Sequence, residues 1–173
     1  MPANPKVSVC IPVRNGAAHL YETLTSVLNQ RFTDFEVVIA DNASSDETAN
    51  ILADFATSDS RVKVWRYGDA VGMAENWNRV VSHASGRYVV LLSADDMLLP
   101  EFLSVCVREL EAGDCAAVSC EHFLMYGSKL VRRKLRMKPG TYKRFCSLVM
   151  LKNPFSINFT LFRAKELASV RRS

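Results

Sequence analysis

The sequence predicts an α/β fold in which helices flank a mostly parallel central sheet. Short apolar runs rich in β-branched residues alternate with segments whose apolar residues recur at helical spacing, as in parallel sheets joined by right-handed crossovers. Most of the runs are apolar at successive positions, which is typical of strands covered on both faces. With 173 residues, 49% hydrophobic and 23% charged, the chain suits a single domain and excludes collagen, coiled-coil and disordered proteins.

The first half of the chain supplies strands and helices in regular order. Strands are expected at Val7–Pro12, Phe35–Ala40 and Tyr88–Leu92. Arg61–Trp65 alternates apolar and polar residues, which favours a strand at the edge of the sheet. Helical spacing predicts two helices between these strands, one carried by Leu20, Leu24, Val27 and Leu28 and one by Ala49, Leu52, Ala53 and Ala56. Ligands of such a sheet are expected beyond the carboxyl ends of its strands.

The second half predicts one further helix and a less regular segment. Pro100 and Glu101 are typical of a helix start, so Glu101–Glu111 should be helical and should end before Gly113. The strand pattern resumes at residues 116–119, and Lys129–Met137 is expected to form an exposed ribbon or loop. The sequence contains no internal repeat and no low-complexity linker, so residues 1–173 are expected to be one domain.

Composition also limits the cellular setting. No apolar run reaches the roughly 18 residues that a membrane-spanning helix needs. The first six residues lack the apolar core of a signal peptide, so we expect a cytoplasmic protein. The five cysteines are odd in number and scattered, which predicts mostly buried thiols in a reducing compartment and neither a zinc site nor a disulfide scaffold.

Polar loops follow three of the expected strands. They are residues 12–16, 41–48 and 93–96. Because the carboxyl ends of parallel strands share one edge of a sheet, these loops should converge and assemble a site. Each loop has a simpler explanation, since Asp46 can cap the second helix and Asn15-Gly16 can form a turn.

The adjacent carboxylates Asp95 and Asp96 are the strongest chemical signal in these loops. Two carboxylates at the end of an apolar strand repel each other unless a cation, a helix N-terminus or water compensates. One of them can cap the following helix while the other stays in water. With the other two loops at the same edge, a hard cation is the better explanation, because Mg²⁺ favours one or two carboxylates together with phosphate oxygens.

Four ordered blocks of sequence resemble the family 2 glycosyltransferases, which have the GT-A fold. The blocks are Val9–Asn15, Phe35–Thr48, Gly72–Tyr88 and Leu91–Asp96, and Thr160–Arg163 is similar to a later strand of that family. The resemblance covers residues 6–112 in order and spacing and extends more loosely to the end. It implies a Rossmann-like, mostly parallel sheet, a nucleotide-diphospho-sugar donor, a divalent metal (Mn²⁺ or Mg²⁺) and transfer with inversion at the anomeric carbon.

The resemblance also assigns site residues by position. The first nucleotide-contacting loop corresponds to Pro12, Val13, Arg14 and Asn15, and Asp41 to the acid that reads the base or ribose. Ser93, Ala94 and Asp95 stand where the family has an Asp-x-Asp metal motif. Asp95 is therefore the expected metal ligand, with Asp96 in support.

Two departures from the family pattern bear on these assignments. The first Asp of the metal motif is Ser93 here, which predicts weaker metal binding. Trp77 stands at a position that is often Arg, while Asn78 keeps the family's Asn and is assigned to nucleotide-sugar binding. Trp77 has a second interpretation as an anchor between helix and sheet.

The catalytic base has no counterpart in this sequence. In the family it comes from an acidic motif after the helix that begins near Arg163, and the sequence printed here stops at Ser173. Only Glu121 and Glu166 remain among the acids after Asp114, and neither matches. We therefore expect a domain truncated before its base. The alternative is a non-catalytic nucleotide-sugar-binding or assembly module.

Charge is divided unevenly along the chain and predicts partners. Residues 1–127 hold 9 Lys and Arg against 17 Asp and Glu, a net −8, whereas residues 128–173 hold 13 against 1, a net +12. The basic part can attract an anionic membrane surface or a lipid-phosphate acceptor, or it can be a solvated face. We expect a UDP-sugar donor, a glycan or lipid-linked acceptor, a peripheral position at the cytoplasmic face of the membrane, a homo-oligomer and no nucleic acid.

Overall fold

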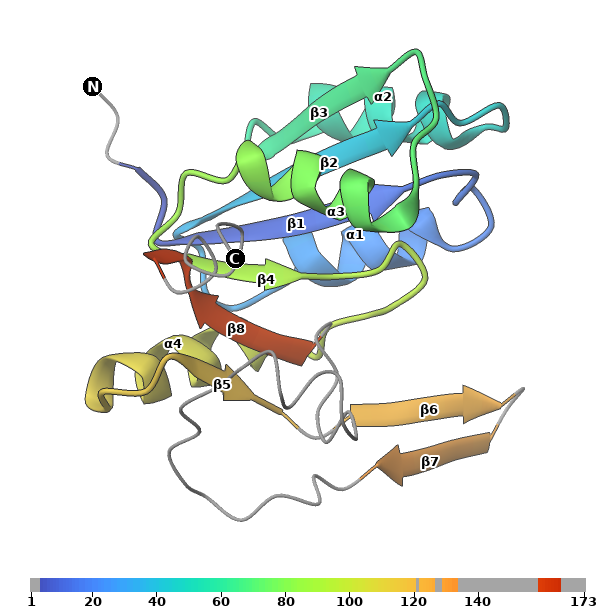
Figure 1. The fold of residues 1–173 in the computed structure, drawn as a ribbon. Helices are drawn as coiled ribbons and strands as arrows, with labels where there is room; N and C mark the ends of the chain where they lie inside the picture. The colour runs from blue at the N-terminus through green and yellow to red at the C-terminus, as the bar shows by residue number, and fades with distance from the viewer. Residues whose placement is uncertain (1–3, 121, 127–128, 134–158, 166–173) are drawn as a thin grey trace.

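A central sheet of six strands organises the chain (Figure 1). The computed structural model describes residues 4–120, 122–126, 129–133 and 159–165. The strand order is β3-β2-β1-β4-β8-β5, in which β1 to β4 are parallel and β8 runs antiparallel to both β4 and β5. The predicted mostly parallel sheet is confirmed, and so is the edge position of the alternating strand. Its strands are β1 (Val7–Val13), β2 (Phe35–Asn42), β3 (Val62–Tyr67), β4 (Tyr88–Leu91), β5 (Ala117–Ser119) and β8 (Thr160–Arg163).

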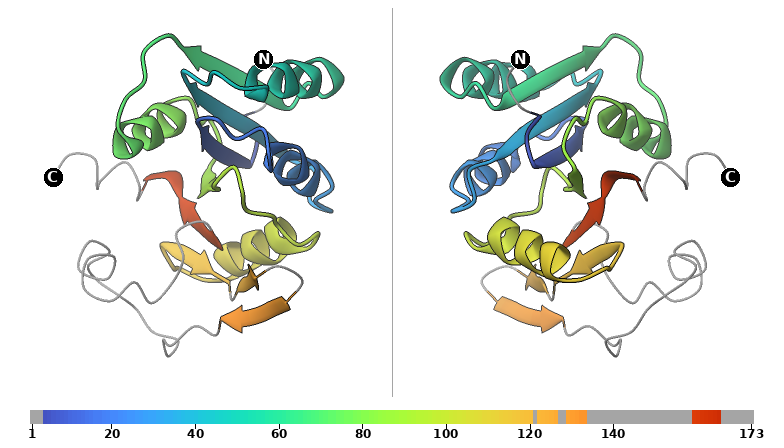
Figure 2. Two further views of the ribbon diagram at one scale, coloured as in Figure 1. Left: turned by 90° about the vertical axis from the view of Figure 1, so that its right-hand side faces the viewer. Right: turned by 90° about the vertical axis from the view of Figure 1, so that its left-hand side faces the viewer.

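In the described residues four helices cover the sheet, and they are divided unequally between its faces. Packing places α1, α2 and α4 against one face and α3 against the other, as the two side views in Figure 2 show. Their bounds are α1 (Leu20–Leu28), α2 (Thr48–Ser58), α3 (Met73–Ser82) and α4 (Phe102–Ala112). None of the described helices has the length and apolar composition needed to cross a membrane.

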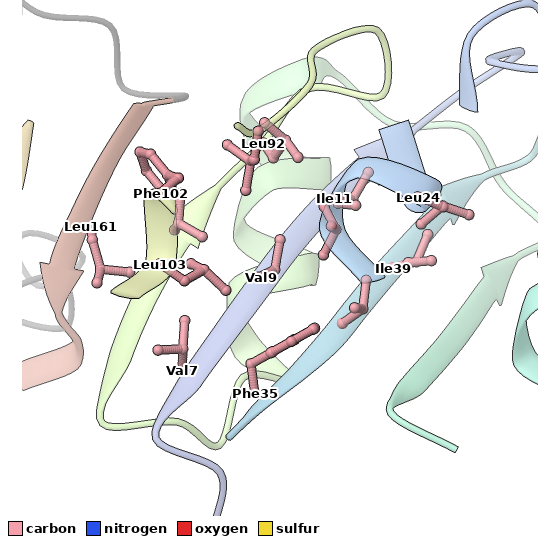
Figure 3. Packing of buried hydrophobic residues seen from close by; sticks show 14 of the residues in the cluster. Val7, Val9, Ile11, Leu24, Phe35, Ile39, Leu92, Phe102, Leu103 and Leu161 are labelled. Atoms are coloured by element: carbon pink, nitrogen blue, oxygen red, sulfur yellow. The ribbon is translucent and has the colours of Figure 1, made fainter. Parts of the chain in front are cut away.

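Alternation along the strands explains how the faces divide. On β2, Val37 and Ile39 pack with α1 in the larger core cluster, whereas Val38 and Ala40 pack under Val80 of α3. Successive side chains of a strand point to opposite faces, so an apolar residue at every position is what a sheet covered on both sides requires. Figure 3 shows the larger cluster, in which β1, β2, α1, α4 and β8 contribute side chains.

A buried carboxylate connects neighbouring segments of the chain at the amino-terminal edge of the sheet. Glu36 is 3% exposed and accepts hydrogen bonds from the Ser8 hydroxyl (2.6 Å), the Ser85 amide (2.8 Å) and Lys63 Nζ (2.7 Å). Burial alone favours the neutral acid, but the hydrogen bonds from Lys63, Ser8 and Ser85 together outweigh it and hold the pKa of Glu36 below its usual range. This cluster lies at the edge opposite the polar loops and stabilises the sheet there.

The second half of the chain also forms a two-stranded ribbon separate from the central sheet. Strands β6 (His122–Tyr126) and β7 (Lys129–Arg133) pair antiparallel, which confirms the expected ribbon for residues 129–133. Residues 134–137 lie outside the described part of the chain. Of the described cysteines, Cys10 and Cys106 are buried, Cys120 is half-buried and Cys115 is exposed.

Candidate functional site

A pocket of about 520 Å³ opens at the carboxyl ends of β1, β2 and β4. The three polar loops predicted to converge all contribute to it, together with the start of α3. Its lining consists of Pro12, Val13, Arg14, Asn15, Gly16, Ala18, His19, Asn42, Val71, Met73, Asn76, Trp77, Ser93, Ala94 and Asp95. Six predicted binding residues besides Asp95 are therefore brought together: Pro12, Val13, Arg14, Asn15, Ser93 and Ala94.

Side-chain hydrogen bonds fix the first loop against the second. The Asn15 amide donates to Ser44 Oγ at 2.9 Å, and Asn15 Oδ1 accepts from the Ser45 amide at 2.9 Å. Asn15 and Ala43 have φ values of 52° and 56°, a left-handed conformation that Asn tolerates better than most residues. The loops therefore hold these conformations through reciprocal contacts.

Asp46 completes the connection between the two loops. Its carboxylate accepts hydrogen bonds from the Thr48 amide at the start of α2 (3.1 Å) and from the Ala17 amide (3.1 Å). Hydrogen bonding with the Thr48 hydroxyl, and then with these amides, holds the pKa of Asp46 below its usual range. The predicted capping role is confirmed, and the same carboxylate also joins the first loop to the second.

Helix α1 holds the third loop in place. The Thr23 hydroxyl donates to the Ala94 carbonyl at 2.9 Å, and the Leu98 amide donates to Ser26 Oγ at 3.1 Å. Gln30 is 4% exposed; its Nε2 donates to the Leu99 carbonyl at 2.8 Å. The main-chain path after β4 is thus set by three polar side chains about seventy residues earlier, two in α1 and one just after it.

The two adjacent carboxylates have different surroundings. Asp95 is exposed on the pocket wall, and among the residues that the structure describes none donates a hydrogen bond to its carboxylate or pairs with it. Asp96 is half-buried and lies off the wall, and its amide donates to the Ser93 carbonyl at 3.1 Å, which closes the turn. No group of three or more His, Cys, Asp and Glu side chains suited to a metal occurs in the described residues. A metal held here would have Asp95 as its direct protein ligand and would need ligand oxygens as well.

The acid predicted to read the nucleotide lies behind the pocket. Asp41 is fully buried, accepts a hydrogen bond from the Ser44 amide (3.0 Å) and pairs with Arg66 (3.0 Å). The strand pleat explains this placement, because Asp41 shares a face with Val37 and Ile39, and the neighbouring residue points to the α3 side. That neighbour is Asn42, which lines the pocket. The sequence of β2 alone does not distinguish Asp41 from Asn42, because it does not show which face of the strand meets α3.

Helix α3 contributes a different asparagine from the one predicted. Asn76 is 4% exposed and lines the pocket, whereas Asn78 is exposed and lies off the wall. Two residues along a helix point to nearly opposite sides, while Asn76 and Val80, four apart, share the buried side. A polar residue in an apolar helical stripe was the signal that could have identified Asn76. Trp77 fits both interpretations, since it lines the pocket and packs on the smaller core cluster.

Comparison with known proteins agrees with this architecture. The protein-family model described as "Glycosyl transferase family 2" matches residues 8–167. Over 110 residues the chain is 33% identical to the GalNAc(5)-diNAcBac-PP-undecaprenol beta-1,3-glucosyltransferase of Campylobacter jejuni, an alignment that covers 63% of this chain and 36% of that protein. The chain thus spans little more than a third of that relative's length.

Two solved structures share the arrangement of strands and helices. S. aureus TarS in complex with UDP-GlcNAc superimposes with a TM-score of 0.78 at 20% identity, covering 96% of this chain and 47% of TarS. The mannosyltransferase PcManGT from Pyrobaculum calidifontis, in complex with GDP-Man and Mn²⁺, gives 0.70 at 22% identity and covers 98% of this chain and 47% of that one. These likenesses establish the GT-A fold. With the family model matched over nearly the whole chain, the protein belongs to glycosyltransferase family 2.

Proposed function

We propose that the pocket binds a nucleotide-diphospho-sugar, with a UDP-sugar as the expected donor, and that the sugar passes to an acceptor hydroxyl with inversion at the anomeric carbon. The observation that carries this proposal is the pairing of opposite charges on two walls of one pocket. Arg14 belongs to the loop after β1, and the Asp95 carboxylate, which has no partner in the described part of the chain, belongs to the loop after β4. A diphosphate between them would meet a cation directly and a carboxylate through a divalent metal.

Each group has a distinct task in this proposal. Arg14 binds the diphosphate, and Asp95 holds Mn²⁺ or Mg²⁺, while Asp96 supports it by closing the turn at Ser93. When bound, the metal neutralises negative charge on the departing diphosphate. Asp41 acts as a positioning residue, because its carboxylate holds the Ser44 amide and Ser44 Oγ holds the Asn15 amide.

The acceptor and the setting of the reaction are also proposed. The Campylobacter relative is named for an undecaprenol-linked acceptor, which supports a glycan or lipid-linked acceptor for this chain. We therefore propose a role in polysaccharide or lipid-linked glycan assembly at the cytoplasmic face of the membrane. The excess of basic residues after position 128 favours an anionic membrane surface nearby. The two acids that remain after Asp114, Glu121 and Glu166, lie outside the described residues. We assign neither of them as the base.

Calorimetric titration tests the donor proposal. UDP, GDP and dTDP are titrated into the chain with and without Mn²⁺, alongside Asp95→Asn and the control Asp54→Asn, which changes an exposed acid on α2. UDP is expected to bind best, Mn²⁺ to strengthen it at least ten-fold, and only Asp95→Asn to remove the Mn²⁺ effect. Equal affinity with and without Mn²⁺ in all three proteins would refute the metal assignment. Nucleotide binding without sugar transfer to any acceptor would favour the non-catalytic module.

A further inference from the structure

Asn76 carries a buried hydrogen-bond acceptor that the protein leaves unused. Its side chain lines the pocket from α3, and its Nδ2 donates to the Ala40 carbonyl at 3.3 Å. A carbonyl oxygen only accepts hydrogen bonds, so this contact fixes which end of the amide faces β2. Asn76 Oδ1 is then buried and has no hydrogen-bond partner among the residues that the structure describes. Because a buried polar atom without a partner is costly, it is rare in folded proteins and points to a missing donor.

The neighbouring polar groups are already satisfied. Asn42 Nδ2 donates to the Val71 carbonyl at 2.8 Å, and Asn42 Oδ1 accepts from the Val71 amide at 2.9 Å. The Asp41 carboxylate is occupied by the Ser44 amide and by Arg66. Among the described groups on the pocket wall near the end of β2, Asn76 Oδ1 is therefore the buried acceptor that is available to a ligand.

The chemistry of this oxygen identifies the part of the ligand that meets it. A carbonyl oxygen repels diphosphate oxygens, which carry no hydrogen, and it attracts an N–H or O–H group. Asn76 contacts the end of β2 through Ala40, whereas Asp95 follows β4, two strands across in the order β2-β1-β4. With the diphosphate at Arg14 and Asp95, the end of the ligand that reaches Asn76 is the nucleoside.

We propose that Asn76 is a nucleoside-recognition residue whose Oδ1 accepts a hydrogen bond from a donor on the nucleoside, either a base N–H or a ribose hydroxyl. This inference rests on the proposed function, since it requires a nucleotide in the pocket. Its position on the buried side of α3, four residues before Val80, and its bond to the Ala40 carbonyl keep the oxygen in one orientation before the ligand arrives. Binding then satisfies an acceptor that is unsatisfied in the free protein.

The test measures coupling between this residue and the ligand's donors. UDP, 2′-deoxy-UDP and N3-methyl-UDP are titrated into the parent, Asn76→Ala and Asn50→Ala, which removes the same amide from an exposed site on α2. For the parent, one of the two analogues is expected to bind at least ten-fold more weakly than UDP. Asn76→Ala should bind UDP about ten-fold more weakly and should lose the difference between UDP and that analogue, while Asn50→Ala behaves as the parent does.

The outcomes separate this inference from the proposed function. Failure of the parent to bind UDP, GDP or dTDP refutes the proposed function and this inference with it. UDP binding by the parent that is unchanged in Asn76→Ala refutes the role of Asn76 alone. If Asn76→Ala does not fold, the titrations of the parent alone test the inference. A ten-fold loss of affinity with either analogue supports it, and equal affinity for all three ligands overturns it. The analogue that loses affinity identifies the donor as the base or the ribose.

Discussion

Replacing Gln30 by Met should destabilise the protein by about 3 kcal/mol. Gln30 Oε1 accepts a hydrogen bond from the Leu103 amide (3.0 Å) in the first turn of α4, and Nε2 donates to the Leu99 carbonyl (2.8 Å). Glu101, at the N-cap of α4, makes no side-chain capping bond, so Gln30 caps this helix from the turn that follows α1. Nε2 also lies 3.4 Å from the carbonyl of Leu98, a residue that is 4% exposed. Losing such a cap costs about 1 kcal/mol, and leaving the buried Leu98 carbonyl without this donor costs about 2 kcal/mol.

Urea unfolding measures this effect. Met has nearly the length of Gln and keeps the site filled, so the loss reports the missing hydrogen bonds more than a cavity. The parent and Gln30→Met are compared through the midpoint and slope of unfolding. Since Gln30 also holds the chain after Asp95, Gln30→Met should weaken Mn²⁺-dependent UDP binding as well. A loss below about 1 kcal/mol at unchanged slope would refute the reasoning, because it would mean that water replaces the side chain at both contacts.

Three further predictions concern parts of the fold away from the pocket. The pKa of Glu36 is lowered by folding, so its contribution to stability is present above the usual value of 4.5 and is lost as pH falls through the folded pKa. Glu36→Gln should therefore reduce the loss of unfolding free energy that the parent shows at acid pH. An unchanged pH dependence of the unfolding free energy would contradict this. Gly86→Ala places a Cβ 2.6 Å from a backbone nitrogen of β1 and should lower the free energy of unfolding in urea by about 1–3 kcal/mol. Gly68→Ala, which places its Cβ in open space, should leave the free energy of unfolding unchanged. Equal effects of the two substitutions would be contrary evidence. The sulfurs of Cys106 and Cys120 lie 3.4 Å apart, so oxidation with diamide should form a disulfide between them. Peptide mass spectra should then show a loss of two hydrogens from the linked peptides. Dominant pairing of any other cysteines would count against this geometry.

Much of the fold follows from local patterns in the sequence. Runs of residues such as Val37–Ala40 are apolar at every position because both faces of the sheet are covered, and the alternating run at Val62–Tyr67 lies at the edge. The convergence of three loops follows from parallel strands alone. The predicted elements and the pocket's location therefore needed no long-range information.

The detailed composition of the pocket wall depends on long-range contacts that no local pattern encodes. The choice between Asp41 and Asn42 depends on which face of β2 meets α3, and the choice between Asn78 and Asn76 depends on the rotation of α3 about its axis. The bond from Thr23 to the Ala94 carbonyl joins residues 71 positions apart. Such contacts form only after the helices have packed, so the sequence predicts the loops and leaves the orientation of single side chains open.

The polar groups of the pocket divide into those that build it and those left for a ligand. The side chains of Asn15 and Asn42 form hydrogen bonds with neighbouring loops, so each contributes both to stability and to binding. The Asp95 carboxylate and Asn76 Oδ1 have no such partners among the described residues. Replacing Asp95 should reduce binding with little loss of stability, because no internal hydrogen bond to its carboxylate is broken, whereas Asn76→Ala also removes the bond from Nδ2 to the Ala40 carbonyl. A rigid frame that leaves a carboxylate and a carbonyl oxygen unsatisfied is preorganised for a ligand with a metal-bound diphosphate at one end and hydrogen-bond donors at the other.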